Sequence, residues 1–93
     1  MVIWMEPKKL RVIISSNVKY YRFSNKITQE ELAERCGLSA RYISDIENNK
    51  GNIPVDTLEK IAKVLKVKPH LLLKDSKHRD LPKRVNMPVL NNK

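Results

Sequence analysis

The chain has 93 residues, enough for one compact helical domain and too few for a deep catalytic cleft with a second lobe. Its 19 Lys and Arg residues against 10 Asp and Glu residues give a formal net charge of +9, which favours a polyanionic partner such as nucleic acid. No apolar run approaches the roughly 20 residues of a membrane-spanning helix, and the first residues lack the features of a signal peptide, so we expect a cytoplasmic protein with no membrane partner.

Few side chains in this sequence could carry catalytic chemistry. Cys36 is the single cysteine, so no internal disulfide can form, and its helical context predicts a small buried side chain in a reducing compartment. His70 and His78 have no carboxylate or thiol at a useful spacing. We therefore expect no enzyme activity, no metal and no cofactor.

Residues 8 to about 24 are predicted to form an amphipathic helix. Apolar side chains recur at a spacing of three or four along one face: Leu10, Ile13, Ile14, Val18 and Tyr21. We expect the opposite, exposed face to carry Lys8, Arg11, Ser15 and Lys19. The apolar face should pack on the rest of the domain.

Two short helices are predicted next, at about 28–36 and 39–48. Thr28 and Glu31 have the spacing of a capping box, which makes Gln29 the first helical residue. Gly37 stands where this helix must end in a left-handed conformation, and Ala33 is small where the two helices approach closely. An apolar wedge behind the turn would consist of Leu32, Cys36, Leu38, Ile43 and Ile46. With its basic surround, this pattern favours a DNA-reading helix-turn-helix over a plain helical hairpin.

The remaining residues predict a loop, two more helices and a tail. Turn formers at 48–52 make an exposed loop, and Pro54 fits the first turn of a fourth helix. The apolar side of that helix carries Leu58, Ile61, Ala62 and Leu65. Pro69 could start a short fifth helix. We divide the chain into an N-terminal segment at 1–7, a domain at 8–74 and a basic, flexible tail at 75–93.

The five-helix order, with the reading motif in its second and third helices, resembles the Cro and lambda-repressor type of helix-turn-helix domain over about residues 8–74. This resemblance implies an all-α, compact five-helix fold. Within the family, three stretches look most like the controller proteins of restriction–modification systems: Arg41-Tyr42-Ile43-Ser44, Ile46-Glu47, and Asn52 ahead of Thr57-Leu58-Glu59-Lys60-Ile61.

The exposed side of the third helix is the predicted base-reading face. At about 100° per residue, the side opposite the buried isoleucines carries Arg41, Ser44, Asp45 and Asn48. Arg41 can reach guanine O6 and N7, whereas Asp45 could accept from a cytosine amino group or pair with Arg41 instead. Tyr42 lies between core and groove, and the resemblance favours a DNA contact. Ser39, at the start of the helix, completes this set.

Other residues are predicted to contact the DNA backbone. Gln29, at the amino end of the second helix, can bond a phosphate with help from exposed amides and the helix dipole. The resemblance implies the same role, and the alternative is an ordinary solvated residue. The loop adds Asn49, Lys50 and Asn52, of which Lys50 contributes charge rather than sequence reading.

Two further sets of residues have structural roles. The resemblance implies a buried ion pair between Arg22 and Glu47, because Glu47 would otherwise be desolvated without a partner; a DNA contact by Arg22 is the alternative. Leu71, Leu72 and Leu73 either cover the core or, as the resemblance implies, contribute to a symmetric dimer interface.

These features predict a homodimeric, sequence-specific transcription regulator, most often a repressor, that binds a two-fold operator in double-stranded DNA. Two alternatives stay open. One is an antitoxin whose tail binds a small protein partner while the domain represses its own operon. The other is a controller of a restriction–modification or conjugative element that activates at one site and represses at another.

Overall fold

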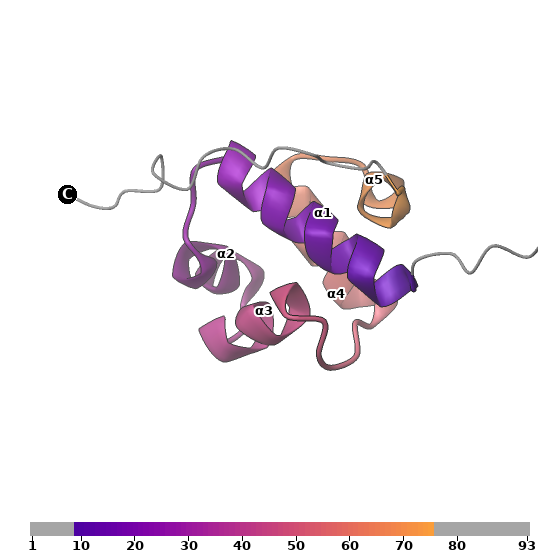
Figure 1. Cartoon of the computed structure of the whole chain (residues 1–93). Helices are drawn as coiled ribbons and strands as arrows, with labels where there is room; N and C mark the ends of the chain where they lie inside the picture. Colours follow the sequence, from indigo (N-terminus) through magenta and orange to yellow (C-terminus); the bar gives the residue numbers. More distant parts are fainter. Residues whose placement is uncertain (1–8, 76–93) are drawn as a thin grey trace, which may run out of the picture.

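The computed structural model describes residues 9–75, and this range forms five α-helices without a strand, as expected for an all-α fold. The helices are α1 (Leu10–Ser24), α2 (Gln29–Cys36), α3 (Ala40–Glu47), α4 (Val55–Leu65) and α5 (Pro69–Leu73). α1 crosses the molecule, with α2 and α3 along its lower side in Figure 1 and α5 near its upper side. Between residues 9 and 75, no helix is both long and apolar enough to cross a membrane. The predicted segment 1–7 and the tail beyond Asp75 lie outside the described residues.

Local capping interactions set the boundaries of α2. Thr28 Oγ1 accepts a hydrogen bond from the Glu31 amide at 3.0 Å, and Glu31 Oε1 accepts from the Thr28 amide at 2.8 Å. The predicted capping box is therefore confirmed. Gly37 ends the helix at φ 72° and ψ 31°, the left-handed conformation that favours glycine.

Three other helices begin later than the sequence predicts, and one of them is α3, which begins at Ala40 with Ser39 as its N-cap. α1 begins at Leu10, with Lys9 as the N-cap in an extended conformation. Pro54 is the N-cap of α4 with ψ 153°, so the helix itself begins at Val55. Pro54 has the φ of −61° that its ring requires, but its extended ψ places it before the first turn rather than within it.

The hydrophobic core lies where all five helices meet. Its buried side chains are Ile14, Val18, Ile27, Leu32, Ala33, Cys36, Ile43, Ile46, Ile61, Ala62, Leu65 and Leu72. Ala33 is 2% exposed, which agrees with its predicted place at the close approach of α2 and α3. The core fixes one side of α3 and leaves its other side at the surface.

α1 buries polar side chains that the helical period alone assigns elsewhere. Ser15, predicted on the exposed face, is 4% exposed, and its Oγ donates to the Glu47 carbonyl at 2.6 Å. Asn17 is 1% exposed, and its Nδ2 donates to the carbonyls of Leu72 and Lys74, each at 2.8 Å. Buried polar groups are tolerated where such bonds satisfy them. These bonds hold the ends of α3 and α5 on α1.

The leucines of α5 do not share one environment. Leu72 is fully buried, so its side chain belongs to the core and offers no surface to a second chain, contrary to the predicted interface. Leu71 is half-buried and Leu73 is 39% exposed. Leu10, predicted on the buried face of α1, is 52% exposed because it lies at the first turn of that helix, beyond the main core. Exposed apolar surface therefore lies on both α1 and α5, and these two helices pack against each other.

Candidate nucleic-acid interface

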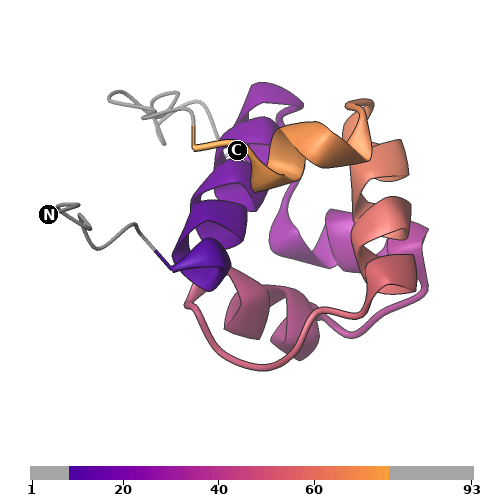
Figure 2. The same cartoon turned by 90° about the vertical axis from the view of Figure 1, so that its right-hand side faces the viewer.

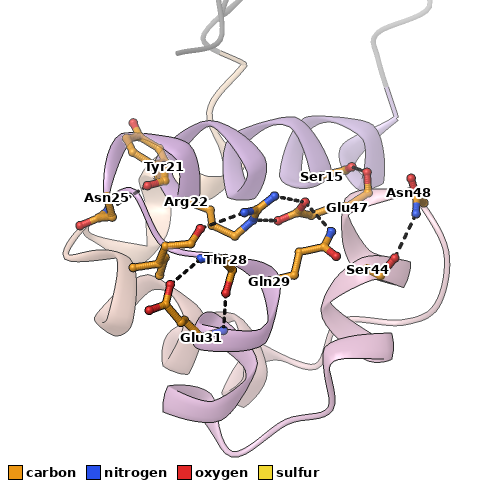
Figure 3. Close-up of polar contacts among 11 residues, drawn as sticks. Ser15, Tyr21, Arg22, Asn25, Thr28, Gln29, Glu31, Ser44, Glu47 and Asn48 are labelled. Atoms are coloured by element: carbon orange, nitrogen blue, oxygen red, sulfur yellow. Dashed lines mark hydrogen bonds and ion pairs between the residues drawn. The ribbon is translucent and has the colours of Figure 1, made fainter. Parts of the chain in front are cut away.

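A buried ion pair connects α1 to the last residue of α3. Arg22 Nε donates to Glu47 Oε2 at 2.6 Å, and Arg22 Nη2 donates to Glu47 Oε1 at 3.0 Å. The two side chains are 7% and 2% exposed. This bidentate geometry is among the stronger hydrogen-bonded pairings in proteins. The ion pair that the resemblance implies is thus present, and Figure 3 shows it between the helices.

Further contacts surround this pair. Arg22 Nη1 donates to the Ile27 carbonyl at 2.9 Å, just ahead of α2, and the guanidinium lies 4.8 Å from the centre of the Phe23 ring. Gln29 Nε2 donates to Glu47 Oε1 at 3.0 Å. Burying two charges costs free energy, and hydrogen bonds such as these offset part of that cost. The resulting polar network fixes the start of α2 and the end of α3 relative to α1.

Gln29 is the first residue of α2, and its contact with a phosphate stays a prediction. Its half-buried carboxamide is directed toward Glu47 in Figure 3. An amide nitrogen carries two N–H groups, so the bond to Glu47 leaves a second N–H that can donate to an anion. The network therefore orients this side chain and does not compete with the predicted role.

The predicted base-reading face of α3 is exposed. The Arg41 side chain is 86% exposed, and its Nε lies 3.5 Å from Asp45 Oδ1, four residues later. This ion pair is the alternative that the sequence leaves open for Asp45. Ser44 Oγ accepts from Asn48 Nδ2 at 3.3 Å, a local contact along the same helix. The structure thus brings these four predicted residues to one face of α3.

Tyr42 connects α3 to the loop that follows. Its hydroxyl donates to the Asn52 carbonyl at 2.5 Å, and its ring packs against the core. Ser39 is the N-cap of α3, with its Oγ accepting from the Tyr42 amide at 3.0 Å. Both side chains therefore support α3 and the loop after it, and their contact with DNA stays a prediction.

The loop between α3 and α4 carries the residues that are predicted to contact the DNA backbone. Asn49 and Gly51 have left-handed φ angles of 67° and 79°, which turn the chain sharply. The Lys50 amide donates to the Asp45 carbonyl at 2.8 Å, so the loop folds back on α3. The side chains of Asn49, Lys50 and Asn52 are exposed. Figures 1 and 2 show the loop along the same lower edge as α3.

Ser15 supports this surface, although no pattern in the sequence predicts that role. Its hydroxyl bonds the backbone of Glu47, which lies 32 residues further along the chain. A serine on a helix is usually a surface residue, and only the packing of α1 across α3 reveals its partner. Ser15 is thus a structural support of the interface that sequence reasoning missed.

Comparisons with known proteins agree with this geometry. The helix-turn-helix family model HTH_3 matches residues 18–72. A hypothetical transcription factor of Neisseria meningitidis is 35% identical over 68 residues, which are 73% of this chain and 64% of the relative. This chain thus spans less than two thirds of that relative's length. A crystal structure of such a Neisseria factor superimposes with a TM-score of 0.73 at 32% identity, covering 85% of this chain and 93% of that one.

Two regulators add to the comparison. Control protein C.BamHI of Bacillus amyloliquefaciens is 42% identical over 65 residues, which are 69% of this chain and 80% of the relative. The biofilm master regulator SinR, solved in complex with DNA, has a TM-score of 0.63 at 39% identity and matches 66% of this chain and 98% of that one. The chain therefore belongs to the helix-turn-helix family, and its resemblance to controller proteins is confirmed.

Proposed function

We propose that this helix-turn-helix protein is a sequence-specific transcription regulator that binds double-stranded DNA as a homodimer and represses transcription at a two-fold operator in the cytoplasm. The observation that carries this proposal is α3, which is buried and bonded through Glu47 on one side and presents exposed polar side chains such as Arg41 on the other. A rigid helix of this kind fits the major groove. The net charge of +9 supplies attraction to phosphates of any sequence.

Arg41 is the proposed base reader. Its ion pair with Asp45 uses Nε, so the two terminal nitrogens remain able to donate to guanine O6 and N7. Asp45 thereby orients the guanidinium and reduces the entropy that the side chain loses on binding. Gln29 and Lys50 hold the phosphates on either side, which sets the register of the helix without specifying bases.

We place the homodimer contact at α5 and the adjoining part of α1. The supporting observation is their exposed apolar surface, which includes Leu73 at 39% and Leu10 at 52% exposure. A symmetric contact there would pair the same patch on both chains. It would also present two α3 helices to major-groove faces about 34 Å apart, one helical turn of DNA.

Selection of bound sites from random duplex DNA tests the proposal. We expect an enriched sequence with two-fold symmetry, and a logarithmic salt dependence that steepens by about 0.9 for each phosphate neutralised. The selected site should bind more tightly than random duplex of equal length. Failure to enrich any sequence, or affinity that does not change with salt, would refute DNA recognition.

Sedimentation of Leu73→Glu tests the dimer. We expect the wild type to sediment as a dimer and the variant as a monomer with an unchanged melting temperature, because Leu73 is already partly exposed. Val55→Glu is the matched control, since Val55 is 70% exposed at the start of α4 and should leave the dimer intact. A wild-type monomer both free and on the selected DNA would reject the homodimer.

A controller protein of a restriction–modification system is the second candidate, favoured by the 42% identity to control protein C.BamHI. The neighbouring genes and the sign of regulation at each selected site would separate it from a plain repressor. The antitoxin alternative depends on the tail, of which the structure describes Asp75 alone. Co-purification with a small protein encoded beside it would support that alternative.

A further inference from the structure

A basic hollow lies between the end of α2 and the second half of α4, apart from the proposed DNA-contacting residues. It has a volume of about 460 Å³ and is lined by Arg35, Cys36, Lys60, Lys63 and Val64. Cys36 is 6% exposed and Val64 is half-buried, so they form an apolar floor beneath three exposed cations. Burial raises the pKa of the Cys36 thiol despite the opposing effect of Lys60, which keeps the floor uncharged.

The cations of this basic hollow have no acidic partner within residues 9–75. None of Arg35, Lys60 and Lys63 forms an ion pair with a described residue, and no acidic residue of the described chain lines the hollow. Arg35 and Lys63 lie in the last turns of their helices, where a positive charge also complements the helix dipole. Lys60 lies in the middle of α4 and gains nothing from that effect.

The hollow is also displaced from the DNA-facing edge of the domain. Gln29 starts α2, whereas Arg35 lies in its last turn, at the far end of the helix. Lys60 and Lys63 follow the start of α4 by five and eight residues, which is a rise of roughly 8 to 12 Å away from the loop. Duplex DNA held by α3 and the loop would therefore leave the hollow accessible.

An acidic peptide segment matches this surface better than a small ligand does. Small-molecule sites enclose most of their ligand, whereas this hollow is open and its charges stand at the rim. A peptide can lay several carboxylates across the three cations while one apolar side chain covers the floor. Charge at the rim and an apolar centre is the usual arrangement of a protein–protein contact.

We propose that the hollow formed by Arg35, Lys60, Lys63 and the floor residues Cys36 and Val64 binds an acidic peptide segment of a protein that acts at the same promoter. The identity of that partner as part of the transcription machinery rests on the proposed function, but the peptide-binding surface itself does not. The regulator would thereby hold DNA with one edge and a second protein with another.

Fluorescence anisotropy with a labelled peptide tests the proposal. The probe is a short fluorescein-labelled peptide of glutamates with one central leucine, titrated with the full chain at low ionic strength. We expect Lys60→Glu combined with Lys63→Glu to weaken binding by about tenfold, because each reversal replaces an attraction by a repulsion. Replacing the central leucine by serine should also weaken binding to the wild type, since the apolar floor then has no partner.

Lys19→Glu combined with Lys68→Glu is the matched control, with the same net charge but both changes outside the hollow. It should weaken peptide binding by less than about threefold, through long-range attraction alone. Circular dichroism melting should show both double variants folded. Equal weakening by the two double variants, or no binding by the wild type, would overturn the proposal.

Binding of random duplex DNA to the same proteins separates this inference from the proposed function. We expect the hollow variant to bind DNA no more weakly than the control variant. A larger loss in the hollow variant would assign the basic hollow to the DNA backbone and overturn peptide binding. A wild type that binds the peptide but no DNA would instead refute the proposed function and leave the peptide site standing.

Discussion

The two ion pairs made by α3 differ in nearly every physical respect. The Arg22–Glu47 pair is bidentate and buried, with side chains 7% and 2% exposed. The Arg41–Asp45 pair joins two residues of one helix at 3.5 Å, with side chains 86% and 32% exposed. Water screens the second pair and leaves the first unscreened, so we expect the buried pair to fix the fold and the exposed pair to orient a reading side chain.

The comparison teaches how one short helix can be rigid and still available for binding. α3 has eight residues, too few for stability on its own, so it depends on contacts with the rest of the domain. Those contacts use its inward side, through the core and the polar network around Glu47. The side chains on the outward side do not pack in the core, so they are available to contact a binding partner.

Glu47→Ala should have the largest effect, because it strands the buried Arg22 guanidinium. We expect a loss of about 3 to 5 kcal/mol in the free energy of unfolding, measured by urea titration. Replacing both residues by apolar ones, as Arg22→Met with Glu47→Leu, should recover part of that loss. A Glu47→Ala protein that unfolds at the same urea concentration as the wild type would show that the pair is exposed in solution.

Arg41→Ala should leave stability nearly unchanged and reduce operator affinity by about 1 to 3 kcal/mol, with relaxed discrimination at one base position per half-site. Lys50→Ala is the contrasting variant. It should weaken operator and random duplex about equally and reduce the salt slope by roughly one, because a phosphate contact does not specify sequence. Equal losses on operator and random DNA for Arg41→Ala would make Arg41 a backbone contact.

Gln29→Ala tests the point at which the buried network reaches the proposed interface. It removes one hydrogen bond to Glu47, so we expect a loss of about 1 kcal/mol in the free energy of unfolding. A double-mutant cycle with Glu47→Gln measures the coupling between the two side chains. Additive losses would mean that the bond contributes nothing in solution. Affinity for random duplex should fall as well if Gln29 bonds a phosphate.

Asp45→Ala should have the smallest effect on stability, about 0.5 kcal/mol or less, because its ion pair is exposed. The effect of this variant on base discrimination distinguishes two roles of Asp45, orienting Arg41 or contacting a base itself. If Asp45 orients Arg41, the variant should relax discrimination at the base position that Arg41→Ala also relaxes. A change at a different position would assign Asp45 to a base contact of its own.

Much of the candidate interface was predictable because its signals are local. Thr28 and Glu31 are three residues apart and define the start of α2, while Gly37 marks its end. The period of α3 separates its buried isoleucines from its exposed polar residues. The same period could not show that the Tyr42 hydroxyl bonds the Asn52 carbonyl, because the path of the loop decides that contact.

The sequence by itself determined the number of helices in the described range, the caps of α2 and the side of α3 that faces outward, since these depend on residues within a few positions of each other. The tertiary structure decided which polar residues of α1 are buried and that Leu72 belongs to the core. Ser15 and Asn17 donate hydrogen bonds to carbonyl groups 32 and 55 residues away. A local sequence pattern cannot indicate a partner at such a separation. Burial depends on which elements pack together, and that is a property of the whole fold.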